Sequence, residues 1–246
     1  IVRREAGEQC DVDFDVVDVA DLPAVRLFAE RFTAANPVLD VLVHNAGALT
    51  ADYRVAPGGS EATLAAQGLG PFLLTSLLLP ALRAASGPAR VITVSSGGMY
   101  AERLDLDTLE MSSDNYKGAT AYARAKRAQV VLNHAWASRV PAGEVVFQAM
   151  HPGWVDTPGV QSGLPTFYRL MKPLLRSPDE GADTIVWLAT DPPAIGSGHF
   201  WIDRRRRTEH PGPWPRRGAR HALWGHRGAR SRACPDPASV VRRRRG

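Results

Sequence analysis

Five short apolar stretches alternate along the chain with segments of helical spacing, and this alternation limits the fold more than any other feature. The stretches are "DVDFDVVDV" (11–19), "VLDVLVHNAG" (38–47), "ARVITVSSGG" (89–98), "EVVFQAMHPGW" (144–154) and "GHFWID" (198–203). The first alternates apolar residues with Asp, and the others are mostly apolar or β-branched, so we expect five strands. Strands alternating with helices form a parallel sheet covered on both faces, which predicts a doubly wound α/β fold.

Two of the helical segments carry clear local signals. The segment 61–85 is long and apolar, which predicts a buried helix that is kinked or turned at Pro71 and Pro80. The segment 177–190 opens with Ser177 and an acidic first turn, which is typical of a helix start. Between the strand at 89–98 and the next helix, residues 102–117 are expected to be exposed.

Small and polar residues follow the expected strands as "HNAG", "VSSGG" and "HPGWVDT". In open α/β sheets, ligands bind beyond the carboxyl ends of the strands. Tyr122 and Lys126 lie four residues apart on a helix that begins on the same side, so their side chains share one helix face. A lysine snorkelling beside a half-buried tyrosine is the structural alternative. The polar strand ends favour a functional pair.

Composition narrows the class of protein. A chain of 246 residues, 44% hydrophobic, suits one large α/β domain or two small ones. The two cysteines, Cys10 and Cys234, indicate neither a disulfide framework nor a cysteine-rich zinc site, and we expect no metal. No uninterrupted apolar run approaches ~20 residues, so no membrane span is expected, and the N-terminus is unlike a signal peptide. We therefore expect a cytoplasmic protein, and the missing initiator Met predicts a processed product or a fragment.

The charge is divided unevenly along the chain. Residues 204–246 hold 14 Arg against one Glu and one Asp, a net +12 within a whole-chain charge of +5, so residues 1–203 are net acidic. This Arg-, Pro- and Gly-rich tail predicts disorder. It is either an electrostatic arm for nucleic acid or an anionic membrane surface, or a non-native sequence such as a frameshifted end of a GC-rich gene. We favour the second, because basic composition alone identifies no specific nucleic acid.

Taken together, the motifs resemble the short-chain dehydrogenase/reductase family from about Cys10 to Asp203, which implies a Rossmann-like domain over 1–203. The resemblance rests on the order and spacing of four groups of residues. They are Asn45-Ala46-Gly47, Ser95-Ser96, Tyr122-Ala-Arg-Ala-Lys126, and His151-Pro152-Gly153 with Thr157.

The resemblance implies a role for each group. Ser96 would bind the substrate carbonyl oxygen, Tyr122 would donate the proton, and Lys126 would lower the pKa of Tyr122 and hold ribose hydroxyls. NAD or NADP would be the cofactor. The implied cofactor-binding residues are Asp18, Val19, Asn45, Ala46, Gly47, Tyr122, Lys126, Pro152, Gly153, Trp154, Val155 and Thr157.

Charge physics agrees with the implied pairing of Tyr122 and Lys126. A free tyrosine has a pKa near ~10, and a cation at ~4 Å in an effective dielectric of ~20 contributes roughly 4 kcal/mol, or about three pKa units. Each residue nevertheless has a structural alternative. Asn45 fits a turn, Ser95 and Ser96 fit caps, and His151 fits a satisfied core histidine.

The sequence departs from the family in two places. The phosphate loop Thr-Gly-x-x-x-Gly-x-Gly is absent, and by resemblance the first two strands are missing, so we expect the sheet to be incomplete at the N-terminus. Gln67 stands where the family usually has an Asn that supports a proton-relay water, and we include it among the catalytic candidates. We also expect this chain to be poorly stable and to bind NAD(P) weakly.

The expected function is hydride transfer between NAD(P) and a small carbonyl or alcohol substrate. Apolar residues in 161–176, among them Leu164, Phe167, Tyr168 and Leu170, are expected to form a lid over a lipophilic pocket. An oligomer is compatible with the sequence. The alternatives are a catalytically silent truncated chain and an interaction protein that acts through its basic tail.

Overall fold

One five-stranded sheet forms the centre of the computed structural model, which describes residues 11–157, 161, 165–190 and 196–210. The strands follow the order β1 (Val41–His44), β2 (Ala89–Val94), β3 (Val145–Met150), β4 (His199–Ile202) and β5 (Arg205–Arg206). The first three pairings are parallel and the last is antiparallel. The predicted parallel α/β sheet is therefore confirmed.

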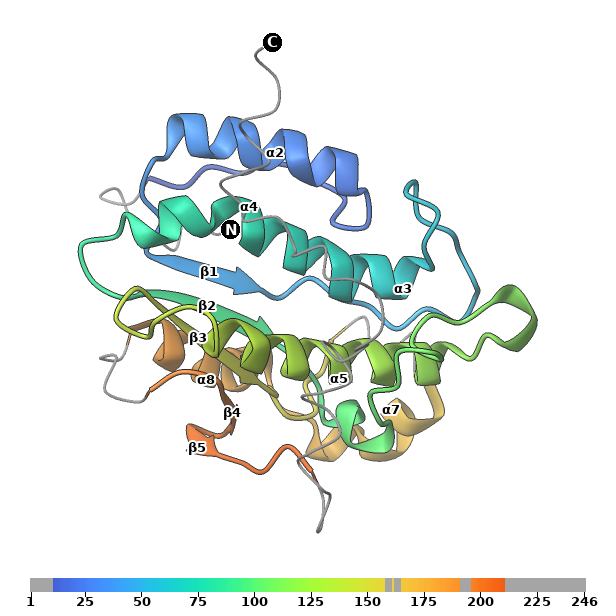
Figure 1. The fold of residues 1–246 in the computed structure, drawn as a ribbon. Helices are drawn as coiled ribbons and strands as arrows, with labels where there is room; N and C mark the ends of the chain where they lie inside the picture. The colour runs from blue at the N-terminus through green and yellow to red at the C-terminus, as the bar shows by residue number, and fades with distance from the viewer. Residues whose placement is uncertain (1–10, 158–160, 162–164, 191–195, 211–246) are drawn as a thin grey trace.

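Helices cover both faces of the sheet (Figure 1). The helices α4 (Gly70–Arg83) and α5 (Gly118–Ala137) lie on one face, with α2 (Leu22–Ala35) packed on α4, and α8 (Pro178–Thr190) lies on the other. Neighbouring strand residues point to opposite faces: Val91 packs with Leu82 towards α4, while Ile92 packs with Leu188 of α8. The shorter elements are α3 (Ala62–Leu64), η1 (Ala65–Leu69), η2 (Gly97–Ala101), η3 (Ser113–Asn115), α7 (Pro165–Met171) and η4 (Lys172–Leu174).

The buried segment 62–83 is helical throughout but changes pitch at η1, which is a π-helical turn. Pro71 has no N–H to donate to the carbonyl of Gln67, and the side chain of Gln129 donates to that carbonyl instead (Nε2 to O, 2.8 Å). The turn predicted at Pro71 is thus a π turn just before it, and the α helix continues through Pro80.

Segment 62–83 is also long and apolar enough to cross a membrane by length and composition alone, although no single apolar run in it suggested this. More than half of its apolar window is buried inside the fold, under α2 and against the sheet. That placement is the one expected of a core helix in a soluble protein.

The strand predicted at 11–19 is wrong, because residues 11–18 are extended without any ladder partner and Val19 lies in a turn. A strand needs a neighbouring backbone to pair with, and no described strand borders β1 on the side away from β2. Phe14 and Val16 are accordingly 83% and 89% exposed, while Val17 packs against the cluster between α2 and α4.

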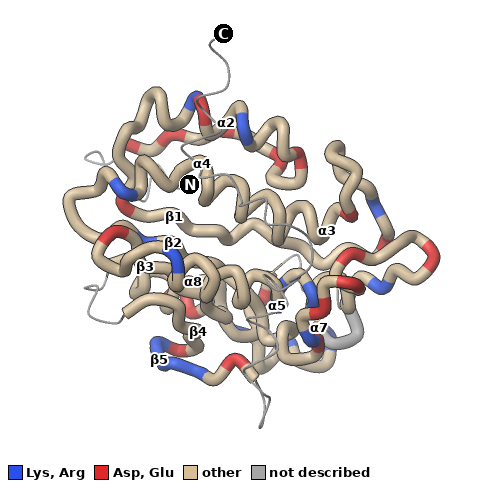
Figure 2. The backbone as a smooth tube through the Cα atoms, in the orientation of Figure 1, with Lys and Arg blue, Asp and Glu red and all other residues tan. Residues whose placement is uncertain are grey.

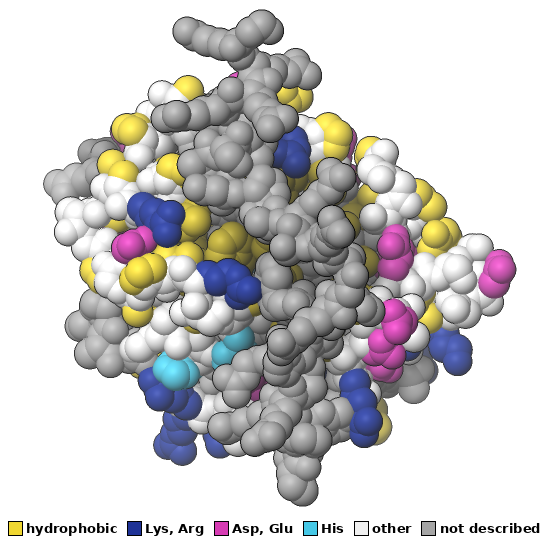
Figure 3. All heavy atoms as spheres, in the orientation of Figure 1, with side chains coloured by type: hydrophobic (Ala, Val, Ile, Leu, Met, Phe, Trp, Pro, Cys, Tyr) yellow, Lys and Arg dark blue, Asp and Glu magenta, His cyan; other side chains and the backbone are white. Residues whose placement is uncertain are grey.

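The first seven residues of the predicted tail are ordered, so the boundary expected after Asp203 does not hold for residues 204–210. Asp203 and Arg204, with φ of 53° and 55°, form a two-residue turn that pairs β5 with β4. Figure 2 shows this basic hairpin at β5, and Figure 3 shows Lys and Arg side chains gathered beside His side chains at the same edge. Residues 211–246 lie outside the described residues.

Candidate functional site

Helix α5 carries both residues of the Tyr–Lys pair and brings them to the carboxyl end of β2. Lys126 is only 3% exposed, and its Nζ donates a hydrogen bond to the carbonyl of Val94 at 2.9 Å. The same Nζ lies 5.5 Å from the centre of the Tyr122 ring. Burial lowers the pKa of Lys126 from 10.5 to about 8. Lys126 therefore ties α5 to the sheet as well as facing the ring of Tyr122.

Ser95 and Ser96 occupy the next two positions after β2. Ser95 Oγ donates to the carbonyl of Lys126 at 2.9 Å, which fixes α5 a second time. Ser96 Oγ accepts from the amide of Gly98 at 3.1 Å and so caps η2, as the structural alternative predicted. The side chain of Ser96 also hydrogen-bonds Tyr122, so it is both a cap and a neighbour of the tyrosine.

The pKa of Tyr122 moves in the direction opposite to the one expected from Lys126. Burial raises it above 10.0, and the hydrogen bond with Ser96 offsets part of the rise. The physical reason is that the ammonium group of Lys126 is directed at the Val94 carbonyl and is itself desolvated. In this structure Ser96, rather than Lys126, is the group that stabilises the tyrosinate.

Gly47 and Gln67 lie on the other side of Lys126. A Cβ atom added to Gly47 would sit 3.0 Å from Gln67 Oε1 and 3.1 Å from Lys126 Nζ, so both polar atoms face the Gly47 backbone. Gln67 Nε2 donates to the carbonyl of Ala48 at 2.8 Å. Gln67 is 1% exposed, and its Oε1 is a buried acceptor without a protein donor. The π turn thus aims an amide oxygen at the space beside Lys126.

The remaining predicted residues of the N-terminal half are placed less centrally. Asn45 and Ala46 directly follow β1 and are exposed. Asp18 accepts from the amide of Ala20 at 2.9 Å, and the carbonyl of Val19 lies against Gly70 at the start of α4. No contact described by the structure joins Asp18 or Val19 to Tyr122 or Lys126.

The loop after β3 carries the other predicted residues. His151, Pro152, Gly153, Asp156 and Thr157 are half-buried, Val155 is buried and Trp154 is 41% exposed. A Cβ atom on Gly97 would sit 3.0 Å from His151 Nε2, so this loop packs against the start of η2. Burial lowers the pKa of His151 to about 4, and its Nδ1 has no protein partner. His151 is therefore a neutral, incompletely satisfied histidine.

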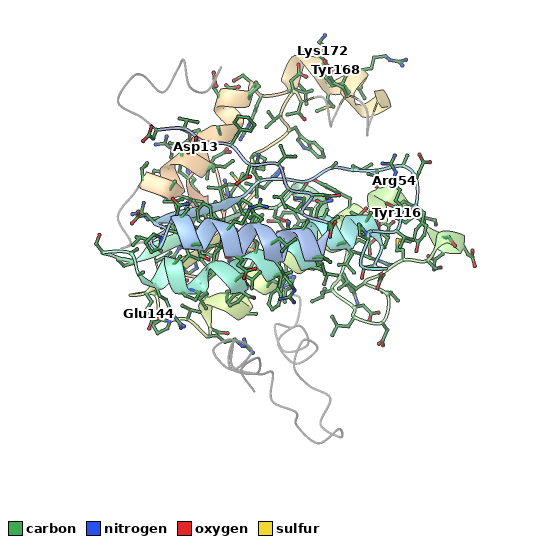
Figure 4. The ribbon with its side chains drawn as sticks, turned by 90° about the horizontal axis from the view of Figure 1, so that it is seen from above. Asp13, Arg54, Tyr116, Glu144, Tyr168 and Lys172 are labelled. Carbon is green, nitrogen blue, oxygen red and sulfur yellow. The ribbon has the colours of Figure 1, made fainter. Side chains whose placement is uncertain are left out.

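Only part of the predicted lid falls within the described residues. Leu164 lies outside them, and the side chain of Phe167 does not belong to the described part. Leu170 and Leu174 are 79% and 73% exposed rather than packed over a pocket. In Figure 4, Tyr168 and Lys172 lie together at the margin of the molecule, and Lys172 Nζ is 5.7 Å from the centre of the Tyr168 ring.

Three positions near the site were missed by sequence reasoning. Arg176 and Asp203 form an ion pair beside the loop after β3, and Gln129 holds the carbonyl of Gln67. A small pocket behind Gln67, between α4, α5 and the sheet, is lined partly by His44, Thr75, Gln129 and Asn133. Only Gln129 had a local signal, because Pro71 leaves one carbonyl unbonded.

Comparison with known proteins decides the family. Residues 2–165 match the protein family described as short chain dehydrogenase. The chain belongs to this family. Human dehydrogenase/reductase SDR family member 12 is 40% identical over 211 residues, which is 85% of this chain and 65% of that protein. Polyprenol dehydrogenase of Danio rerio is 34% identical over 215 residues, covering 84% and 66% respectively.

These figures agree with "VITVSSGGM" and "MHPGWVDTPGV", which resemble the member-twelve subgroup. The chain spans about two thirds of the length of these curated relatives. A solved structure from Mycobacterium paratuberculosis matches with a TM-score of 0.58 at 28% identity, over 75% of this chain and 60% of that chain. A short chain dehydrogenase from Shigella flexneri, complexed with NADP, matches with a TM-score of 0.61 at 20% identity, over 78% and 74%. The Rossmann-like expectation for the fold is thereby confirmed.

The residues present fit one end of a dinucleotide. Gly47 leaves open the space that a Cβ would fill between Gln67 and Lys126, and Gln67 Oε1 faces that space as an unpaired acceptor. These groups suit a ribose with hydroxyl donors. The phosphate end has no counterpart, because the sequence holds no glycine-rich loop between a strand and a helix.

Proposed function

We propose that this chain is an NAD(P)-dependent oxidoreductase that acts on a carbonyl or alcohol, with Tyr122 as the general acid and base. The observation that carries the proposal is the convergence of Ser96, Tyr122 and Lys126 at the carboxyl end of β2, where Ser96 hydrogen-bonds Tyr122 and Lys126 lies beside its ring. The human and zebrafish relatives carry the words dehydrogenase or reductase in their names, which supports the same chemistry.

Each side chain has one task in the proposed mechanism. The bound nicotinamide supplies or accepts the hydride. Ser96 Oγ donates a hydrogen bond to the substrate oxygen and stabilises the negative charge that develops there. Tyr122 Oη transfers its proton to that oxygen during reduction and recovers it during oxidation. Lys126 and Gln67 bind the ribose side through the ammonium group and the free amide oxygen.

A lipophilic substrate is the finer part of the proposal. Relatives named polyprenol dehydrogenase and retinol dehydrogenase 12 are 34% and 36% identical to this chain. Exposed apolar side chains at Trp154, Leu170 and Leu174 lie in the loop after β3 and in the segment that leads to Arg176. We therefore expect apolar aldehydes such as retinal to react faster than sugar carbonyls of similar electrophilicity.

A Tyr122→Phe substitution in the full chain tests the mechanism. Turnover of retinal is expected to fall by at least ~100-fold, the usual weight of general acid catalysis, with NAD(P)H affinity unchanged. Tyr116→Phe is the matched control, since it also removes a hydroxyl bonded to Thr50 and Thr63, and it is expected to retain turnover. Near-normal turnover by Tyr122→Phe would refute the assignment.

A catalytically silent chain is the second candidate, favoured by the missing phosphate loop. Fluorescence titration with NADPH and NADH separates the two. Saturable quenching of tryptophan emission by either nucleotide supports the oxidoreductase, and no binding to a folded chain supports the silent form. A nucleic-acid mobility shift that depends on salt and disappears when 211–246 are removed would instead support an interaction protein.

A further inference from the structure

Arg176, which lies between η4 and α8, is paired with the loop after β3 on both sides of Val155. Its amide donates to the carbonyl of Trp154 at 2.8 Å, and its carbonyl accepts from the amide of Asp156 at 2.9 Å. These two bonds make an isolated parallel bridge between Val155 and Arg176. The main chain of Arg176 therefore holds one wall of the loop 152–156.

The side chain of Arg176 reaches two further points. Its Nη1 and Nη2 donate to the two carboxylate oxygens of Asp203 at 2.5 and 3.0 Å, which is a bidentate ion pair. Nη1 also donates to the carbonyl of Pro152 at 3.1 Å. Asp203 is fixed in the two-residue turn between β4 and β5. The guanidinium group thus connects the end of β4 to the start of the loop.

Gly153 shows how closely the guanidinium group sits on the loop. Its φ is +86°, which favours glycine, and a Cβ atom there would lie 2.6 Å from Arg176 Nη1. No side chain at position 153 is compatible with both the turned backbone and the guanidinium. Arg176, Asp203 and Gly153 together make what we call the Arg176 bracket.

We propose that Arg176 is a positioning residue, which holds the loop 152–156 in the shape that receives the nicotinamide end of the cofactor and is itself oriented by Asp203. This inference rests on the proposed function. An exposed ion pair alone would contribute little to stability. The bracket differs from such a pair because the guanidinium also bonds a loop carbonyl and covers a loop glycine, so its loss changes the loop rather than only the surface.

Hydrogen exchange on the full chain without nucleotide tests the structural half. In Arg176→Gln, peptides covering 151–157 are expected to exchange about tenfold faster, the change that corresponds to one lost charge-assisted hydrogen bond. Asp203→Asn is expected to act in the same direction, and Arg176→Lys to fall between Arg176→Gln and the unaltered chain, because an ammonium cannot bond both carboxylate oxygens in one plane.

Arg83→Gln is the matched control. It removes an ion pair of similar exposure, Arg83 Nε to Glu144 Oε2 at 2.7 Å. Figure 4 shows Glu144 at the end of the molecule opposite to Tyr116. Exchange in 151–157 is expected to stay unchanged in Arg83→Gln. Unchanged loop exchange in both Arg176→Gln and Asp203→Asn would overturn the bracket.

Fluorescence titration with NADPH and NADH tests the cofactor half. Arg176→Gln is expected to raise the Kd about tenfold, in parallel with loop exchange, while Arg176→Lys recovers part of the affinity. Faster loop exchange with an unchanged Kd would overturn the cofactor role. If the unaltered chain binds neither nucleotide, the proposed function fails and the cofactor role fails with it, whereas the exchange result still decides whether Arg176 holds the loop.

Discussion

Replacement of Lys126 by Met should change how the free energy of unfolding depends on pH. Burial lowers the pKa of Lys126 from 10.5 to about 8, so between these values the folded chain releases a proton that the unfolded chain still binds. Stability of the unaltered chain therefore rises with pH over this window and is lost again as pH falls through about 8. At ~1.36 kcal/mol per unit, the full effect is roughly 3 kcal/mol.

Denaturant unfolding between about pH 7 and about pH 10 measures the effect as a difference between the unaltered chain and Lys126→Met, because other titrating groups cancel. The unaltered chain should gain stability relative to Lys126→Met as pH rises. Lys117→Met, at an exposed lysine, should show no such gain. A difference independent of pH would refute the burial argument. A difference of the opposite sign would reveal an anionic partner for Lys126.

A second, direct measurement does not require reversible unfolding. Carbon NMR of the lysine Cε atoms should show one resonance that titrates with a midpoint near 8. That resonance should be absent from Lys126→Met and present in Lys117→Met. A midpoint near the ordinary lysine value for every resonance would contradict the structure.

Two further substitutions test the surroundings of the site. Gln67→Ala should lower turnover roughly tenfold by removing the bond to the Ala48 carbonyl and the free acceptor, and Gln67→Asn should retain more of it; equal turnover in both, measured by nucleotide oxidation, would exclude a relay or ribose role. Gly70→Ala should destabilise the chain by about 1–3 kcal/mol, since its Cβ would meet the Val19 carbonyl, whereas Gly87→Ala meets nothing; a melt that treats both alike would contradict the packing.

The elements that sequence patterns predicted correctly are those whose cause is local. The apolar runs that became β1 to β4 bury both faces, and such runs fit a covered parallel sheet. The Ser177 cap is confirmed as a capping box, with Ser177 N donating to Glu180 Oε2 at 2.8 Å and Glu180 N donating to Ser177 Oγ at 3.2 Å. Both signals lie within a few residues of the feature they produce.

The features that were missed depend on partners distant in sequence. Residues 11–18 alternate like a strand, but alternation describes side-chain faces and says nothing about a backbone partner. The hairpin at Asp203 and Arg204 was hidden by an arginine run that resembles a disordered tail. Arg176 carried no motif, because its role arises only when Asp203 and the loop after β3 come together in space.

The same distinction separates the two residues of the Tyr–Lys pair as experimental probes. Lys126 Nζ bonds the Val94 carbonyl, and Ser95 bonds the Lys126 carbonyl, so Lys126 joins α5 to β2 whatever chemistry it supports. Loss of activity in a Lys126 variant therefore mixes damage to the fold with damage to the site. The pKa of Tyr122 shows only burial and the neighbouring Ser96, so its hydroxyl has little structural work to do. Tyr122→Phe is consequently the cleaner probe of whether this strand end performs proton transfer.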